Sequence, residues 1–345
     1  MIYNRLGKTD LQVSLICLGT MTWGQQNSEK EAHEQLDFAL ARGINFIDTA
    51  ELYSVPSSKE TQGLTEKYIG SWLKKSGKRN EIILATKITG PAKNLSYISP
   101  NLGFSKDRIQ EAIDLSLQRL STDYIDLYQL HWPERSTNYF GRRGYNEHDA
   151  EWQDNILDSI QTLQNLKKSG KIRHFGISNE TPWGVHRYLT LARENGHDVP
   201  VSIQNPYSLL NRTFEIGLAE MAIRENVGLL AYSPLAMGML SGKYLTGKDK
   251  PENRLNQFKY FSRYTKTNAR EATQAYLDLA KEYNFSLTQM ALAFVNQQEF
   301  LTSNIIGATD LVQLEENIQS IEINLNPEVL QKINEIHEKI PNPTP

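Results

Sequence analysis

The sequence has one cysteine, Cys17, in 345 residues. A single thiol excludes an intramolecular disulfide and any zinc or iron–sulfur site built from several cysteines. The N-terminus lacks the apolar core of a secretory signal, and no segment approaches the ~18 consecutive apolar residues that a membrane-spanning helix needs. These absences predict a cytoplasmic protein with no membrane partner.

An excess of charge of one sign is also missing. Lys and Arg number 37 and Asp and Glu 40, so the formal net charge is -3. Nucleic-acid-binding proteins usually gather basic residues on one face, so nucleic acid is not an expected partner. The sequence lacks H-E-x-x-H and any comparable ligand cluster, so no metal site is expected. Hydrophobic residues make up 39%, which is ample for the core of a globular protein.

Short apolar runs alternate with longer segments of helical periodicity along almost the whole chain. The runs are nearly continuous, as parallel strands buried on both faces are. The intervening segments carry apolar residues at i, i+3 and i+4, and several end at a glycine, as at Gly43, Gly77 and Gly170. The predicted strands are 15–18, 45–48, 82–87, 125–130, 174–178, 202–205, 228–233 and 304–307. The predicted helices are 29–42, 65–75, 106–120, 154–168, 182–194 and 214–225, then 269–283 and 286–298 before the last strand, and 311–321 and 327–339 after it.

Eight strand–helix units predict an α/β protein, a (β/α)8 TIM barrel forming one domain over residues 1–345. Such barrels routinely exceed 250 residues as one domain. An open doubly wound sheet could give the same alternation, but no G-x-G-x-x-G follows the first strand. The extra helices decorate the barrel. Long connections after strand ends, at 54–63, 89–105, 132–153 and 236–268, should build the active-site face.

Four ionisable side chains follow the ends of three successive predicted strands: Asp48, Tyr53, Lys87 and His131. Taken singly, a strand-end Asp often caps a helix, and a Tyr or His is usually a packed core residue. Taken together, a buried Lys needs the Asp as a partner and places a positive charge beside the phenol. We therefore predict a lowered Tyr53 pKa and assign Tyr53 as a general acid.

Several segments together resemble the aldo-keto reductases over nearly the whole chain. They are D-T-A-E-L-Y, the strand-end Lys87, L-Y-Q-L-H-W-P, G-I-S-N and I-I-G-A-T-D-L-V-Q-L-E-E-N. The segments are most similar to the bacterial Tas-type, NADP(H)-dependent branch and, more distantly, to potassium-channel β-subunits. The resemblance implies direct hydride transfer from a nicotinamide cofactor, NADPH (NADP+), to a small-molecule carbonyl substrate. Tyr53 would donate the proton, Lys87 would lower its pKa, Asp48 would hold Lys87, and His131 would orient the carbonyl.

The resemblance also implies a cofactor site. Ser178, Asn179 and Gln204 would hold the nicotinamide amide, and Tyr207 would stack on the ring. The pyrophosphate would lie along Tyr232, Ser233, Pro234 and Leu235 with Gly238 and Lys243. A P-loop is an unsuitable reading of G-M-L-S-G-K at 238–243, because this segment is one residue short and no Ser or Thr follows the Lys.

At the adenosine end, the resemblance implies Gly307, Thr309, Gln313, Glu316 and Asn317, with Thr22 and Trp23 also beside the cofactor. An ordinary capped helix at 311–321 is the competing interpretation. Many family members have an Arg where Gln313 stands, so Arg254 would supply the contact to the 2′-phosphate of NADPH. The alternative for Arg254 is a solvated loop residue.

Aromatic residues in the predicted mouth loops could line an apolar substrate pocket, although loop packing also explains some of them. Trp23, Tyr53, His131 and Trp132 are the predicted substrate contacts, with Tyr139, Phe140, Tyr145 and Trp152 as further candidates. Arg135, Arg142 and Arg143 could recognise a carboxylate or a sugar phosphate, or could simply be solvated.

Two other functions compete with carbonyl reduction. One is an NADPH-binding regulatory or redox-sensing subunit with little turnover, which the channel-subunit resemblance permits and the intact set of four residues disfavours. The other is a barrel hydrolase using Asp48 and Glu51 as a carboxylate pair. The hydrolase would leave Tyr53 and Lys87 without a role.

Overall fold

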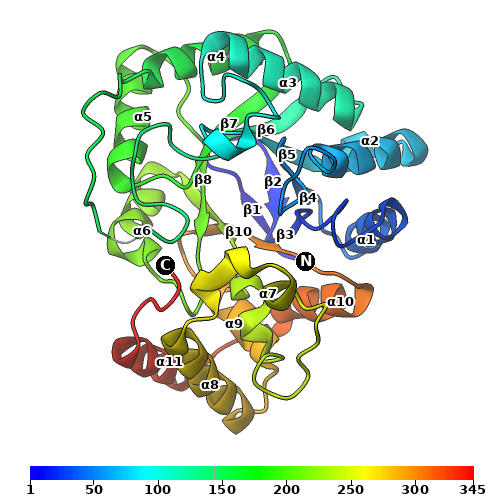
Figure 1. Ribbon diagram of the computed structural model, residues 1–345, viewed down its shortest axis with the longest axis vertical. Coiled ribbons are helices and arrows are strands. Elements are labelled where there is room, and N and C mark those ends of the chain that lie inside the picture. Colours follow the sequence, from blue (N-terminus) through cyan, green and yellow to red (C-terminus); the bar gives the residue numbers. More distant parts are fainter. Residues whose placement is uncertain (143) are drawn as a thin grey trace.

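Eight parallel strands close into a barrel in the computed structural model, which describes residues 1–142 and 144–345. Each strand pairs with the next along the chain, and the last, β10, pairs with the first, β3. The predicted (β/α)8 fold is therefore confirmed (Figure 1). The strands are β3 (Ile16–Gly19), β4 (Phe46–Asp48), β5 (Ile83–Ile88), β6 (Ile125–Leu130), β7 (Ile172–Ser178), β8 (Ser202–Pro206), β9 (Gly228–Tyr232) and β10 (Leu301–Ile306).

Strand β10 begins at Leu301, three residues before the predicted start. Residues 302–304 of this strand are polar in sequence but buried, with Ser303 and Asn304 both at 0% exposure. The Ser303 hydroxyl donates to the Ser14 carbonyl at 2.7 Å, and the Asn304 amide donates to Asn296 Oδ1 at 2.9 Å. Hydrogen bonds to other elements thus make these polar residues tolerable in the barrel wall.

The helices surround the barrel as predicted, and their boundaries agree with the prediction to within two residues. Side-chain caps fix several starts: the hydroxyls of Ser28, Ser105 and Thr181 each accept a main-chain N–H from the first turn. The predicted helix 311–321 is shorter and continues as a 3-10 turn. The helices are α1 (Glu29–Ala41), α2 (Leu64–Ser76), α3 (Lys106–Leu120), α4 (Ile156–Lys168), α5 (Pro182–Glu194), α6 (Phe214–Glu225), α7 (Arg254–Gln257), α8 (Thr267–Glu282), α9 (Leu287–Asn296), α10 (Leu311–Gln319) and α11 (Pro327–Lys339), with 3-10 helices η1 (Arg79–Glu81), η2 (Lys93–Leu95), η3 (Ala236–Ser241), η4 (Lys259–Tyr264) and η5 (Ser320–Glu322).

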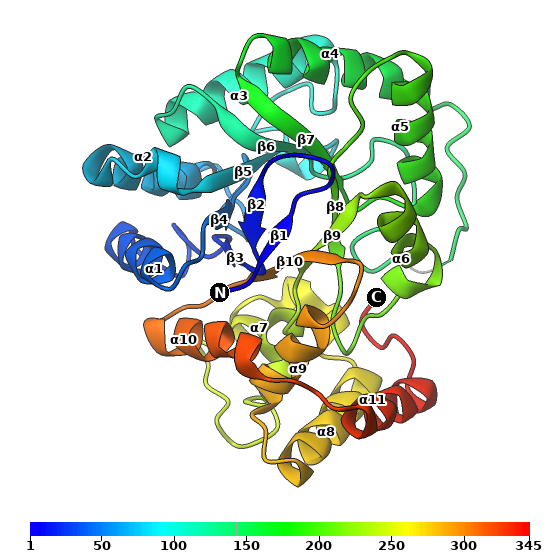
Figure 2. The same ribbon diagram turned by 180° about the vertical axis from the view of Figure 1, so that it is seen from behind.

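A two-stranded hairpin that the sequence patterns did not predict crosses the N-terminal end of the barrel (Figure 2). Its strands are β1 (Tyr3–Arg5) and β2 (Gln12–Ser14). Leu6, Leu11 and Val13 of this segment are buried and pack in one cluster with inward-facing barrel residues such as Phe46 and Leu127. The hairpin therefore plugs one end of the barrel, and the other end is left for a site.

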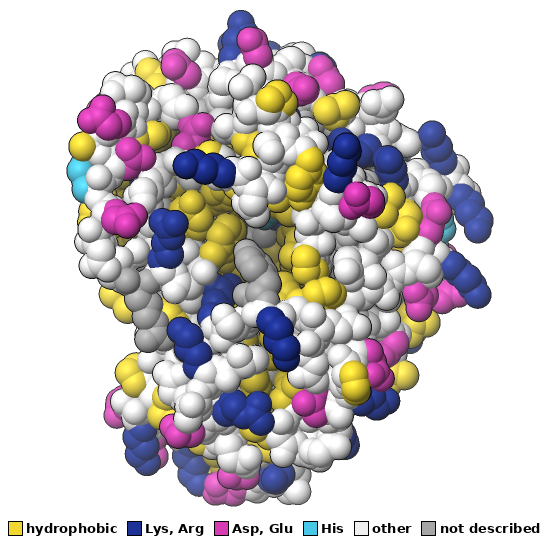
Figure 3. All heavy atoms as spheres, viewed as in Figure 1, with side chains coloured by type: hydrophobic (Ala, Val, Ile, Leu, Met, Phe, Trp, Pro, Cys, Tyr) yellow, Lys and Arg dark blue, Asp and Glu magenta, His cyan; other side chains and the backbone are white. Residues whose placement is uncertain are grey.

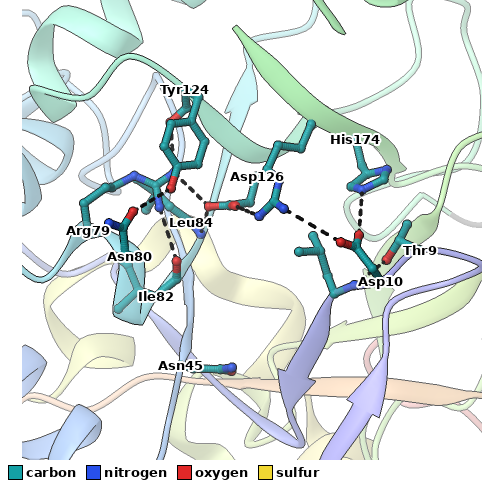
Figure 4. A network of polar contacts seen from close by, with 12 residues as sticks. Thr9, Asp10, Asn45, Arg79, Asn80, Ile82, Leu84, Tyr124, Asp126 and His174 are labelled. Carbon is teal, nitrogen blue, oxygen red and sulfur yellow. Dashed lines mark hydrogen bonds and ion pairs between the residues drawn. The ribbon is translucent and has the colours of Figure 1, made fainter. Parts of the chain in front are cut away.

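The plugged end also carries a saturated charge network around Asp126, at the start of β6 (Figure 4). Asp126 is 1% exposed and accepts from Arg79 at 2.8 Å, from Arg173 at 3.0 Å and from the Leu84 main-chain N–H at 2.9 Å. A cavity of about 860 Å³ opens beside these residues and is lined by His174, among others. Asp126 is thus fully hydrogen-bonded, and this end of such barrels typically serves stability.

The opposite end of the barrel carries the long loops. Those after β9 contain η3, α7 and η4, so this predicted loop is partly helical. Figure 3 views the molecule from this side and shows a central hollow with hydrophobic side chains inside it and Lys and Arg side chains around it. The site predicted at the strand C-termini lies at this end.

Candidate active site

Lys87 on β5 lies at the centre of the site and is completely buried. Its ammonium donates to Asp48 Oδ2 at 2.6 Å and to the Thr49 carbonyl at 2.8 Å, and it lies 3.3 Å from the Tyr53 hydroxyl oxygen. Strands β4 and β5 are neighbours in parallel register, with Asp48 opposite Ala85, so their C-terminal ends bring the two charges together. The predicted Asp48–Lys87–Tyr53 grouping is present.

Asp48 is held by neutral donors as well as by Lys87. Its second oxygen, Oδ1, accepts from the Gln129 amide at 3.1 Å and from the Gln204 amide at 2.9 Å. Both oxygens of this buried carboxylate are therefore hydrogen-bonded. Gln129, on β6, was not among the predicted site residues, because a Gln inside an apolar strand carries no signal of its partner.

The Lys87 pKa is raised above its ordinary value. Burial alone would lower it, but the nearby Asp48 carboxylate and, to a lesser extent, Tyr53 favour the ammonium and outweigh burial. The site therefore holds a permanent positive charge beside the phenol.

The predicted lowering of the Tyr53 pKa is wrong. Burial raises the pKa of the phenol more than the Lys87 charge lowers it, and Asp48 adds to the rise. The side chain is half-buried at the mouth. Tyr53 is therefore a protonated hydroxyl at neutral pH, in the form that a proton donor requires, and Lys87 is placed to stabilise the phenolate after donation.

His131 completes the grouping from the end of β6. Its ring centre lies 5.9 Å from that of Tyr53, in an edge-to-face arrangement. Burial, and then the Lys87 charge, hold the pKa of His131 well below its ordinary value, so the imidazole is neutral. Its Nδ1 atom is buried, and no residue among those described hydrogen-bonds to it. A neutral imidazole can still donate one hydrogen bond from a ring nitrogen.

Glu51 does not form a carboxylate pair with Asp48. One of its oxygens accepts from Arg108, and the other accepts from the Thr89 main-chain N–H at 3.0 Å. Both oxygens are therefore engaged in fixing the Tyr53 loop to the β5 end. The hydrolase reading loses its second carboxylate.

The residues predicted to bind the nicotinamide amide lie beside this grouping. The Ser178 hydroxyl donates to the Gln204 carbonyl at 2.8 Å. The Asn179 amide donates to the His131 carbonyl at 2.9 Å, and its Oδ1 accepts from the Tyr232 hydroxyl at 2.6 Å. The Gln204 Nε2 atom donates to Asp48, so the Oε1 atom of Gln204 is the one that could accept a hydrogen bond from a ligand amide. Strands β7, β8 and β9 thus present one connected polar edge.

Tyr207, predicted to stack on the nicotinamide, lies elsewhere. Its ring is 0% exposed, stacks on Phe294 at 5.9 Å and donates its hydroxyl to Glu215 at 2.6 Å. The stacking prediction is wrong, because the chain turns inward after β8 and buries this ring in the aromatic core. The aromatic ring beside Asn179 is instead that of Tyr232, which is half-buried.

The predicted phosphate segment follows β9 and has an unusual backbone. Ser233 (φ 54°) and Gly238 (φ 94°) adopt left-handed conformations, and Lys243 Nζ lies 3.6 Å from where a Cβ on Gly238 would be. Pro234 is buried and Leu235 half-buried. The tight turn therefore presents main-chain groups and one lysine together, as anion sites do.

Arg254, at the start of α7, is half-buried and has no Asp or Glu partner in the part of the chain that the structure describes. Its Nε donates to Gln26 Oε1 at 2.9 Å, and Nη1 lies 3.7 Å from the Met237 sulfur. Burial lowers the pKa of Arg254 to about 10. Burial and, next, the positive charge of Arg254 lower the pKa of Lys243. Two neighbouring cations, neither of which forms an ion pair with an Asp or Glu among the described residues, suit a phosphate.

The predicted adenosine-binding side chains are mostly engaged within the protein. Asp310 caps α10 by accepting from the Gln313 N–H, and the Gln313 amide returns to Asp310 at 2.7 Å. Glu316 accepts from Ser286, and the Asn317 amide donates to the Gly307 carbonyl at 3.2 Å. Thr309 contributes its hydroxyl to the same cap. Gln313, Glu316 and Asn317 therefore have the contacts of a capped helix, while Gly307 leaves open space.

Trp23 is not at the mouth. It is 0% exposed, donates its indole N–H to Gln35 at 3.2 Å and packs in the main core, so the prediction that it contacts substrate is wrong. Thr22 beside it is 4% exposed, and its carbonyl accepts from the turn at 25–27. A tryptophan after a strand end gives no sign in sequence of whether it turns inward.

Trp132 does lie against the site. Its ring centre is 4.9 Å from that of His131 and 5.7 Å from that of Phe140, which contacts Tyr139 in turn. A Cβ on Gly90 would lie 2.5 Å from the Trp132 indole nitrogen, so glycine is what allows this close packing. Aromatic rings therefore form a continuous wall from Tyr53 to Phe140, which is 44% exposed.

Some of the remaining residues predicted at the mouth are paired within the protein, and others are exposed. Arg135 forms a two-bond ion pair with Glu180, at 2.9 and 2.6 Å, so it is not free to bind substrate. Trp152 packs near Trp183, and Tyr145 is exposed and bonded to His148. Arg142 is exposed, and Arg143 lies outside the described residues.

Within residues 1–142 and 144–345, no group of His, Cys, Asp and Glu is arranged to hold a metal ion. Over the same residues, no helix combines the length and the apolar character needed to cross a membrane.

A closed barrel with a buried Lys–Asp pair, a tyrosine and a neutral histidine at the C-terminal strand ends is the architecture of a barrel oxidoreductase. The aldo/keto reductase family matches residues 15–338, and the chain belongs to that family. It is 49% identical to Protein tas of Escherichia coli over the full length of both chains. It is 40% identical to an aldo-keto reductase of Babesia bovis over 76% of this chain and 98% of that one. It is 35% identical to the uncharacterized oxidoreductase YrpG of Bacillus subtilis, over 97% and 96%.

Proposed function

We propose that this family member is an NADPH-dependent reductase that converts aldehydes or ketones into alcohols. The observation that carries the proposal is the Lys87 ammonium, held by Asp48 at 2.6 Å and 3.3 Å from the Tyr53 hydroxyl oxygen. A phenol with its proton in place, next to a permanent cation that stabilises its conjugate base, can protonate a carbonyl oxygen as the carbon is reduced.

Each residue then has a part in the reaction. Tyr53 donates its proton to the carbonyl oxygen, and Lys87 stabilises the phenolate that remains. Neutral His131 donates a hydrogen bond to the same oxygen and orients it. Asp48 keeps Lys87 in place and charged, and Gln129 and Gln204 hold Asp48 by donating to its Oδ1 atom.

The cofactor assignment is supported by the polar edge and the cation pair. Ser178, Asn179 and Gln204 would hold the nicotinamide amide, and the turn at Ser233 to Gly238 with Lys243 would hold the pyrophosphate. Arg254, without an acidic partner, would bind the 2′-phosphate that distinguishes NADPH from NADH. When bound, NADPH supplies the hydride that the carbonyl carbon accepts.

A panel of aldehydes and ketones, followed by NADPH consumption, tests the proposal. We expect turnover of several substrates with NADPH and weaker activity with NADH. NADPH binding without turnover of any carbonyl compound would contradict the proposal and would favour a regulatory subunit.

A further inference from the structure

Gln129 is a completely buried amide on β6 that contacts two other side chains of the site. Its Nε2 atom donates to Asp48 Oδ1 at 3.1 Å, and its Oε1 atom accepts from Gln204 Nε2 at 3.2 Å. Gln204 Nε2 also donates to Asp48 Oδ1 at 2.9 Å. The three side chains therefore form a closed triangle of hydrogen bonds, in which both N–H groups of the Gln204 amide have acceptors.

The strand register explains how the two amides meet. Gln129 lies opposite Lys87 on β5 and opposite Gly176 on β7. Because glycine has no side chain, no side chain at that position of β7 lies between Gln129 and Gln204. A Cβ built on Gly176 would lie 2.6 Å from Ser202 Oγ, so a larger residue does not fit there. The barrel interior therefore brings the two amides into direct contact.

The triangle fixes which way the Gln204 amide faces. The Asp48 carboxylate can only accept hydrogen bonds, and the Gln129 Oε1 atom is a second acceptor, so both favour Gln204 Nε2 on their side. If the Gln204 amide turned over, its Oε1 atom would face these two acceptors, and both would lose a donor. The Gln204 Oε1 atom is therefore kept turned away from them, as an acceptor for the amide of the proposed cofactor.

We propose that Gln129 is a positioning residue for the cofactor. It holds the Gln204 amide in the orientation that accepts a hydrogen bond from the nicotinamide amide, and it ties Gln204 to the carboxylate that pairs with Lys87. Gln129 acts through Gln204 and sets the affinity for NADPH without taking part in proton transfer. This inference rests on the proposed use of NADPH.

Two substitutions separate positioning from packing. Gln129→Leu fills a similar volume and removes both hydrogen bonds, so NADPH binding should weaken by roughly three- to tenfold, the effect of about one neutral hydrogen bond. Gln129→Glu keeps the shape, and its protonated carboxyl group can still donate to Asp48 and accept from Gln204. Once ionised, the new group can only accept, and it repels the Asp48 carboxylate.

The pH dependence of NADPH binding distinguishes the two forms of the new carboxyl group. Burial and the Asp48 charge raise its pKa, and Lys87, already paired with Asp48, opposes this only in part. The native titratable side chains in this part of the barrel are those of Cys17, Asp48, Tyr53, Lys87 and His131. The raised pKa values of Cys17, Tyr53 and Lys87 and the lowered pKa of His131 leave these four groups in one protonation state between about pH 6.5 and 8.5.

Fluorescence titration of each variant with NADPH across this range makes the measurement. Gln129→Glu should bind NADPH nearly as the wild type does at the acidic end, and its affinity should fall toward that of Gln129→Leu as the pH rises. Gln129→Leu should stay weaker than the wild type by the same factor throughout. Gln274→Leu and Gln274→Glu are the matched controls, because Gln274 on α8 is exposed and donates to Asp278 at 2.9 Å. Both controls should bind NADPH as the wild type does.

Two results would overturn the inference and leave Gln129 as a packing residue. One is wild-type affinity in Gln129→Leu, and the other is an equal loss in Gln129→Leu and Gln129→Glu at the acidic end of the range. A wild-type protein that does not bind NADPH would refute the proposed function, and the inference would fail with it. Binding by the wild type therefore separates a failure of the inference alone from a failure of both.

Discussion

The two ends of the barrel each bury an aspartate at a strand terminus, and the difference between them separates a structural charge from the charge that we propose to be catalytic. At the N-terminal end, Asp126 accepts from Arg79, Arg173 and a main-chain N–H, and these donors converge on it. At the C-terminal end, Asp48 accepts from Lys87, but Lys87 also contacts the Tyr53 hydroxyl. All the donors around Asp126 thus end on that carboxylate. The Lys87 ammonium, in contrast, contacts both Asp48 and the titratable Tyr53 hydroxyl at the mouth.

Burial sharpens this contrast. The Lys87 and Asp48 side chains are 0% and 3% exposed, whereas Arg173 at the other end is 43% exposed. A fully buried ion pair gains little net stability over a well-packed apolar pair, because both ions lose their hydration. The Lys87–Asp48 pair is therefore better explained by its effect on Tyr53 than by its contribution to folding.

The largest expected effect on stability comes from breaking the Lys87–Asp48 pair. Lys87→Met should lower the free energy of unfolding by about 3–5 kcal/mol, because Asp48 is left buried without its cation. It should also lower kcat/KM by at least about a hundredfold, because the phenolate of Tyr53 loses its stabilising charge. Urea denaturation and steady-state kinetics measure the two effects. Tyr53→Phe, which leaves the ion pair intact, is the matched control, and equal stabilities of the two variants would refute the buried pair.

Breaking the network at the other end should separate stability from activity. Asp126→Asn should lower the free energy of unfolding by about 2–3 kcal/mol, a smaller loss than at Lys87 because Arg173 is partly hydrated. The kcat/KM per folded molecule should stay near the wild-type value. Asp114→Asn, which removes the exposed partner of Lys171, controls for loss of a surface charge. Lost activity without lost stability would contradict the division of roles between the two ends.

Removing Arg254 from the proposed phosphate site should affect the binding of one cofactor only. Arg254→Ala should weaken NADPH binding by roughly one to two orders of magnitude and leave NADH binding nearly unchanged, because a charge-assisted contact contributes ~1.5–3 kcal/mol. Fluorescence titration with both cofactors makes the comparison. If the two affinities fall together, or neither changes, Arg254 does not bind the 2′-phosphate.

The smallest effect concerns the two histidines, His131 at the mouth and His174 at the plugged end. Burial lowers the pKa of both, but nearby Asp10 partly raises that of His174. Unfolded histidine takes up a proton below about pH 6.5, while the native side chains stay neutral to a lower pH, so stability is present above that pH and is lost as pH falls.

Each such histidine contributes up to about 1.4 kcal/mol of lost stability per pH unit. His131→Gln should therefore flatten the decline in unfolding free energy between pH 7 and 5 more than His174→Gln does. Urea denaturation of both variants across this range checks the order, and a larger effect at His174 would contradict it.

The barrel and the four central residues of the site could be predicted because a residue at the end of a strand has a known position in the barrel. Asp48, Lys87 and His131 each close an apolar run, and parallel strands bring their C-terminal ends to one rim. The hairpin of β1 and β2 was missed because three-residue strands are too short to show a period.

Burial, in contrast, could not be read from the sequence. Tyr207 and Trp23 follow strand ends just as Tyr53 and Trp132 do, yet their rings turn into the core. The sign of the Tyr53 pKa shift was missed for the same reason: the sequence indicates the neighbouring Lys87, but the loss of hydration depends on how the loops pack.

The account depends most directly on the Tyr53 proton, and one variant isolates it. Tyr53→Phe removes the hydroxyl and keeps the ring, so kcat/KM for aldehyde reduction should fall by about a hundredfold to ten-thousandfold. NADPH affinity, measured by fluorescence titration, should change little, because the hydroxyl acts in the transition state. A variant that binds NADPH normally and retains most of its reductase activity would show that Tyr53 is not the proton donor.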